Sequence, residues 1–109
     1  MIEVRIEREA GGALVRVSST GHAGAENSAA CLGVTTLLKS AARALAERPA
    51  LQMTGAAPHP GSMRFQVGVS NAEDAEYARG VTELLVCGLS ELAAEFPGEL
   101  RLTVQQSDA

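Results

Sequence analysis

Residues 20–45 read TGHAGAENSAACLGVTTLLKSAARAL, and within them a strand pattern gives way to a helix pattern. After the small residues of the loop, apolar and small side chains recur at steps of three and four, which is typical of one face of a helix. Pro49 ends this pattern, because a proline disfavours the α conformation of the residue before it. The sequence therefore predicts a helix over about residues 28–48, with a stripe of Cys31, Val34, Thr35, Leu38, Ala41, Ala42 and Leu45.

The segment before this stretch has the period of two that marks half-buried strands. In IEVRIER (residues 2–8) Ile2, Val4 and Ile6 alternate with charged residues. A glycine-containing turn at residues 9–13 then leads into LVRVSS (residues 14–19), where Val15 and Val17 are expected to face inward. These two segments predict a β-hairpin that ends at Gly21.

The segment after the helix predicts two short strands, a second helix and a last strand. Leu51 and Met53 belong to the first strand, and residues 63–69 alternate in the second. LRLTVQ (residues 100–105) alternates again. The helix between them, over about residues 70–96, has an expected stripe of Tyr77, Val81, Leu84, Leu85, Leu89, Leu92 and Phe96, with Gly80 and Gly88 as points where another element approaches closely.

The predicted order is therefore β-β-α-β-β-α-β. Strands that are polar on one face, together with two amphipathic helices, indicate an α+β domain with a mainly antiparallel sheet and both helices on one face. The length of 109 residues fits one domain, residues 1–109.

Composition narrows the range of functions. The net charge of −4 and the nine scattered basic residues do not favour direct nucleic-acid binding, and they suit a basic partner. Two cysteines do not make a secreted disulfide framework, and the charged start MIEVRIEREA is not a signal peptide. No run approaches the ~20 apolar residues of a membrane span. We expect a cytoplasmic protein without a membrane partner.

One histidine and one cysteine lie on either side of the loop. His22 follows the hairpin and Cys31 falls in the first turn of the helix, where the helix dipole and a nearby imidazole both favour a thiolate. This pairing predicts a cysteine nucleophile with a histidine base. Other interpretations are a buried structural Cys31 and a redox pair of Cys31 with Cys87. A metal site built on His22, Cys31 and His59 lacks close-spaced ligand pairs, so no metal or cofactor is expected.

The stretch GHAGAENSAACLGVTTLLKSAARAL resembles the ribosomal-processing cysteine proteases, the Prp family. The Gly21-His22 pair, Cys31 and Thr35 match the family's motif, and the length and order of elements agree with it in outline. The family's Asp falls on Ser28, with Asn27 just before it, and the family's mid-loop glycine is replaced by Ala25 or Glu26.

The resemblance implies a cysteine endopeptidase that removes a short N-terminal extension from a protein of the large ribosomal subunit, acting as a homodimer in the cytoplasm. Cys31 would be the nucleophile and His22 the base. The resemblance also implies supporting or substrate-loop roles for Gly21, Gly24, Asn27, Ser28 and Thr35. The loop over residues 23–30 would bound the substrate cleft. Because Ser28 replaces the Asp, a second interpretation stays open, a module that binds the ribosomal protein without cutting it.

Overall fold

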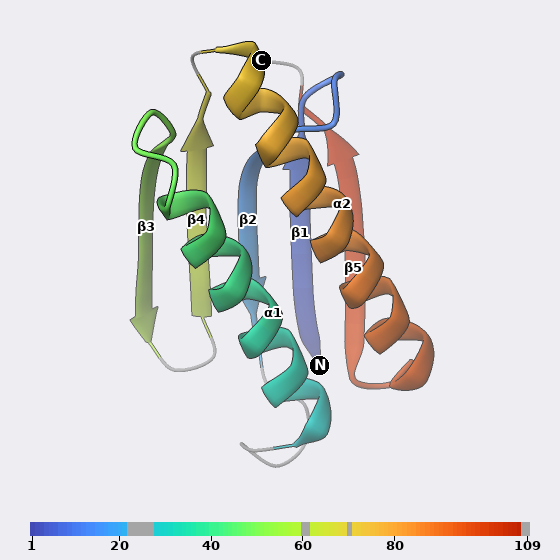
Figure 1. Ribbon diagram of the computed structural model, residues 1–109. Helices are drawn as coiled ribbons and strands as arrows, with labels where there is room; N and C mark the ends of the chain where they lie inside the picture. The colour runs from blue at the N-terminus through green and yellow to red at the C-terminus, as the bar shows by residue number, and fades with distance from the viewer. Residues whose placement is uncertain (22–27, 60–61, 70, 108–109) are drawn as a thin grey trace.

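The computed structural model describes residues 1–21, 28–59, 62–69 and 71–107 of the chain, with the side chains of 56–59 excepted. The elements follow the predicted order (Figure 1). They are β1 (Ile2–Arg8), β2 (Leu14–Thr20), α1 (Ala29–Ala46), β3 (Gln52–His59), β4 (Ser62–Gly68), α2 (Ala72–Glu95) and β5 (Leu100–Gln106).

The five strands form one mixed sheet in the order β3-β4-β2-β1-β5. Three of the neighbouring pairs are antiparallel, and only β1 with β5 is parallel. The sheet is thus mainly antiparallel, as predicted. The outer strand β5 lies beside a strand far away in the sequence, so that Ile2 at the start of β1 pairs with Leu100 of β5.

Both helices lie on one face of the sheet, as the sequence predicted (Figure 1). The reason is topological. The connection β2-α1-β3 and the connection β4-α2-β5 each join strands that run in the same direction, and such crossovers are nearly always right-handed. The second connection starts from a strand of opposite direction and moves the opposite way across the sheet. Because the strand direction and the direction of travel across the sheet are both reversed, a right-handed crossover places α2 on the same face of the sheet as α1.

The core lies between this face and the helices. Alternation along β1 buries Ile2, Val4 and Ile6. The periodicity of α1 buries Ala30, Val34, Leu38, Ala41 and Leu45. By length and composition alone α1 is apolar enough to cross a membrane. Its buried stripe against the sheet, with Lys39 and Arg43 on the exposed side, is the pattern of a helix packed on a core.

Two details of the predicted core are wrong. In β2 the residue that turns inward is Leu14, which is fully buried, whereas Val15 is only half-buried. The pairing with β1 shifts from Glu7–Arg16 to Arg8–Leu14, so Val15 is an extra residue that reverses the alternation. In α2 the predicted Leu84 is 72% exposed. The buried residues of that helix are Asp74, Ala78, Thr82, Leu85 and Leu89.

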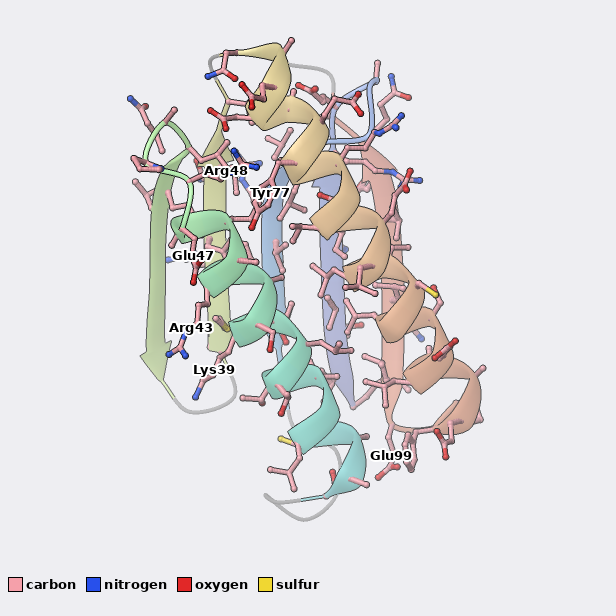
Figure 2. All side chains as sticks on the ribbon, viewed as in Figure 1. Lys39, Arg43, Glu47, Arg48, Tyr77 and Glu99 are labelled. Atoms are coloured by element: carbon pink, nitrogen blue, oxygen red, sulfur yellow. The ribbon has the colours of Figure 1, made fainter. Side chains whose placement is uncertain are left out.

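The carboxyl end of α1 is tied to the amino end of α2 by a small polar cluster. The hydroxyl of Tyr77 donates a hydrogen bond to the carbonyl oxygen of Ala44 at 2.8 Å. The guanidinium of Arg48 lies over the Tyr77 ring, 4.2 Å from its centroid, and 3.9 Å from the buried carboxylate of Asp74. Figure 2 shows Arg48 and Tyr77 facing each other between the two helices.

At the other end the helices approach through glycines. A Cβ atom on Gly33 of α1 would lie 2.9 Å from a terminal carbon of Leu92, and one on Gly88 of α2 would lie 3.0 Å from a terminal carbon of Leu37. Each helix thus lays a leucine over a glycine of the other. The predicted close approach at Gly88 is confirmed, while Gly80 has no neighbour within 4 Å of an added Cβ and the prediction for it is wrong.

Candidate active site

The amino end of α1 is capped by Ser28. Ser28 has extended backbone angles, φ −62° and ψ 158°, and its Oγ accepts a hydrogen bond from the backbone N–H of Cys31 at 3.2 Å. The Ser28 carbonyl accepts a second bond from the N–H of Leu32 at 3.0 Å. Ser28 is therefore the N-cap of α1, and its hydrogen bond fixes the backbone of the predicted nucleophile.

Cys31 is the third residue of α1, in its first turn. There the free N–H groups and the helix dipole create a positive potential, and the first turn holds no acidic residue to cancel it. The side chain is half-buried and packs against the edge of the core. The prediction that Cys31 lies at a helix amino terminus is confirmed.

Both cysteines are free thiols. Cys87 is exposed and lies in the interior of α2, far from either end of that helix. No group of three or more His, Cys, Asp or Glu that could hold a metal ion occurs in the part of the chain that the structure describes.

Gly21 fixes the other end of the loop. It follows β2 directly, at φ +96°, a conformation that residues with a Cβ rarely adopt. A Cβ there would also run into the backbone carbonyl oxygen of Met1. Only glycine lets the end of β2 pass the start of β1 at this point. The direction in which the chain leaves β2 toward His22 is therefore set by a residue without a side chain.

The remaining predicted residues divide between described and undescribed parts of the chain. Thr35 lies on α1 one turn after Cys31 and is half-buried. His22, Gly24 and Asn27 lie outside the described residues, as does most of the loop over residues 23–30. The pairing of His22 with Cys31 and the role of the loop in bounding the substrate cleft stay predictions. The structure describes the residues on either side, Gly21 and Ser28.

Two hollows flank α1, and nothing in the sequence marked either of them, because each is formed by elements distant in sequence. On the side of β4 a hollow of about 450 Å³ is lined by Thr36, Lys39, Ser40, Ala42, Arg43 and Met63. Lys39 and Arg43 continue the row of every fourth residue that begins with Cys31, and Figure 2 shows them on this flank of α1.

On the side of α2 the second hollow is a groove of about 470 Å³ between the two helices. It begins at Leu32, the residue directly after Cys31, whose side chain is 54% exposed. Its opposite wall is the carboxyl-terminal part of α2, with Glu91 and Glu95. The two flanks of α1 thus carry side chains of opposite charge.

A free cysteine at the capped amino end of a helix, on an α+β domain with a hollow on each side, defines the site of a candidate thiol-dependent enzyme. The sequence matches the family model described as cysteine protease Prp over residues 1–101, and the chain belongs to that family. Among curated proteins none matches the sequence.

Solved structures share the fold. The essential ribosomal processing protease Prp from S. aureus, in complex with a covalently linked product peptide, is 19% identical with a TM-score of 0.78, over 95% of this chain and 99% of that one. SMU.848 from Streptococcus mutans is 22% identical with a TM-score of 0.76, over 98% of this chain and 96% of that one. At such identities the likeness shows the fold alone, which agrees with the β-β-α-β-β-α-β prediction.

Proposed function

We propose that this protein is a cysteine endopeptidase that removes a short N-terminal extension from a protein of the large ribosomal subunit. The observation that carries the proposal is the position of Cys31 in the first turn of α1, with its N–H held by Ser28, in a chain that belongs to the Prp family. The S. aureus relative of the same fold is described as a ribosomal processing protease and holds a product peptide.

The chemistry that we assign has two steps. The Cys31 thiolate attacks the scissile carbonyl carbon, and the negative charge on the carbonyl oxygen is stabilised by the N–H groups at the amino end of α1. His22, holding the thiol proton, donates it to the leaving amine as the C–N bond breaks. The acyl group remains on Cys31 as a thioester. His22 then removes a proton from water, which attacks the thioester and releases the carboxylate and the thiol.

The second candidate function is a module that binds the ribosomal protein without cutting it. It is favoured by Ser28 in place of the family's Asp, because a serine hydroxyl caps the helix but brings no negative charge to orient an imidazolium. Both candidates place the same basic protein against an acidic chain of net charge −4. Homodimeric assembly belongs to the same proposal and rests on the family alone, while the cytoplasmic location rests on the family and on the composition of the chain.

A digest distinguishes the two candidates. The purified protein is incubated with the matching ribosomal protein from the same genome, made with its N-terminal extension, and the products are identified by mass spectrometry. We expect one cut near the junction of extension and mature chain, made by the wild type and by Cys87→Ser but not by Cys31→Ser. Tight binding of the extended chain without a cut would support the module instead.

A further inference from the structure

We propose that the groove between α1 and α2 is a specificity subsite that takes a lysine or arginine side chain of the substrate, about three or four residues from the cleaved bond. The inference rests on the proposed function for its substrate, a polypeptide that is cut at Cys31. It adds to that function the chemical class of residue that the enzyme selects, and it names Glu91 and Glu95 as the residues that select it.

The floor of the groove is apolar. Leu37 and Leu92 line it, each lying over a glycine of the opposite helix, and Leu32 extends it toward Cys31. Gly33 and Gly88 also line the groove, and they let the two helices lie close together along it. An apolar floor of this kind suits the hydrocarbon stem of a long side chain, which lies along apolar surface while its charged head stays in water.

The rim of the groove is acidic and has no charged partner of its own. Glu91 and Glu95 are exposed and spaced four residues apart on one helix, where like charges repel. They stand at the carboxyl end of α2, where the dipole already disfavours negative charge, and the last turn holds no basic residue. Neither carboxylate makes an ion pair within the described part of the chain. The arrangement costs helix stability, and a cationic side chain in the groove would offset that cost.

The opposite flank of α1 rejects the same side chain. Lys39 and Arg43 line the hollow toward β4, and Figure 2 shows them on the side of α1 away from Glu99, which adds a further carboxylate near the end of α2. Lys39 and Arg43 lie in the second half of α1, so a basic side chain that follows the β4 flank along the helix meets like charge, whereas one in the groove meets Glu91 and Glu95. This difference favours the groove beside α2 for the basic residue.

The distance from Cys31 sets the position of that residue in the substrate. The period of 3.6 residues per turn places Cys31 on the same side of α1 as Ala42, which lines the hollow toward β4, so a bound chain must cross the amino end of α1 to reach the groove. An α-helix with its side chains is about 10–12 Å across, and an extended peptide advances about 3.3 Å per residue. The basic side chain is accordingly expected about three or four residues from the cleaved bond.

Peptide binding to the Cys31→Ser protein tests the subsite without requiring cleavage. The probe is a fluorescent peptide that spans the extension and the start of the mature ribosomal protein, with its basic residues replaced by glutamine and one lysine then placed at each position in turn. We expect lysine at one position, about three or four residues from the junction, to tighten binding about fivefold, and we expect high salt to reduce that gain.

The double variant Glu91→Gln and Glu95→Gln should abolish the gain from that lysine. The matched control is Glu47→Gln with Glu83→Gln, which changes the net charge equally at two exposed carboxylates outside the groove, and it should keep the gain. Equal loss in both double variants, or no lysine position that tightens binding, would overturn the subsite. Failure of the wild type to cut any peptide would overturn the proposed function instead, and the binding comparison would still decide on the groove.

Discussion

Ser28 Oγ lies 3.2 Å from the backbone nitrogen of Cys31 and accepts its hydrogen bond. Ser28, which by the resemblance falls at the position of the family's Asp, is thus hydrogen-bonded directly to the backbone of the predicted nucleophile. Two tasks of an acidic residue at this position, capping the helix and orienting the histidine, are separated here. The structure shows the first task in Ser28, and only a change of residue can show whether the second matters.

Ser28→Ala removes the cap. We expect the free energy of unfolding to fall by about 1 kcal/mol, the usual effect of losing a serine N-cap. We also expect slower cleavage, because the first turn that carries Cys31 will fray. Urea denaturation followed by circular dichroism measures the stability. An unchanged unfolding midpoint would show that the 3.2 Å contact contributes nothing to the helix.

Ser28→Asp keeps a capping oxygen and adds a negative charge. Its stability should equal or slightly exceed that of the wild type, since an acidic N-cap also suits the helix dipole. If a carboxylate orients His22, kcat should rise while KM stays near its wild-type value. A slower enzyme with unchanged stability would assign Ser28 a role that Asp cannot fill.

Gly21→Ala tests the anchor at the other end of the loop. The φ of +96° and the Met1 carbonyl both exclude a Cβ. We expect a loss of more than about 2 kcal/mol in the free energy of unfolding. The matched control is Gly80→Ala on α2, where an added Cβ meets nothing within 4 Å. That change should stabilise the protein by about 0.5–1 kcal/mol through helix propensity. Thermal melts of both variants make the comparison, and equal shifts would contradict it.

Tyr77→Phe tests the link between the two helices far from Cys31. It removes the 2.8 Å hydrogen bond to the Ala44 carbonyl while keeping the ring under Arg48. A net cost of about 1 kcal/mol is expected. Peptide cleavage at a temperature well below the melting point should be unchanged, since the cluster lies at the other end of α1. A drop in kcat with full stability would show that the two ends of the helix are coupled.

Alkylation compares the two cysteines. Cys87 is exposed and Cys31 is half-buried, so accessibility alone predicts faster labelling of Cys87. The proposed mechanism, in contrast, requires Cys31 to be the more reactive nucleophile, with His22 as its base. We expect iodoacetamide to label Cys31 faster than Cys87 at neutral pH, and His22→Ala to slow Cys31 only. Peptide mapping by mass spectrometry gives both rates, and faster labelling of Cys87 would contradict an activated Cys31.

Most of the fold could be predicted from the periodicity of apolar residues in the sequence. The alternation of β1 and the stripe of α1 are local patterns, and they placed the elements, the common face of the helices and the position of Cys31. The details that failed depend on tertiary context. Val15 turned out to be the extra residue of a bulge, which alternation within one strand does not mark. Leu84 lies on the exposed side of α2 although it continues the apolar pattern, because the small residue Ala78 and the hydroxyl of Thr82, bonded to the Ala78 carbonyl at 2.6 Å, face the sheet instead.

The candidate site was predictable only where it is continuous in sequence. Ser28 and Cys31 are three residues apart, and capping chemistry relates them without further structure. The groove joins Leu32 to Glu91 and Glu95, which are brought together only by the packing of α1 on α2. Sequence patterns relate residues within one helix or strand, so they could not predict that Leu32 and these two glutamates line one groove.

Capture of the covalent intermediate tests the central claim most directly. The wild-type protein is mixed with the extended peptide, quenched in acid within the first turnover, and its intact mass is measured. The account predicts an adduct equal in mass to the acyl portion of the extension, mapped to Cys31, absent from Cys31→Ser and present in Cys87→Ser. Cleavage of the peptide by Cys31→Ser at the wild-type rate, or an adduct mapped to Cys87, would contradict it.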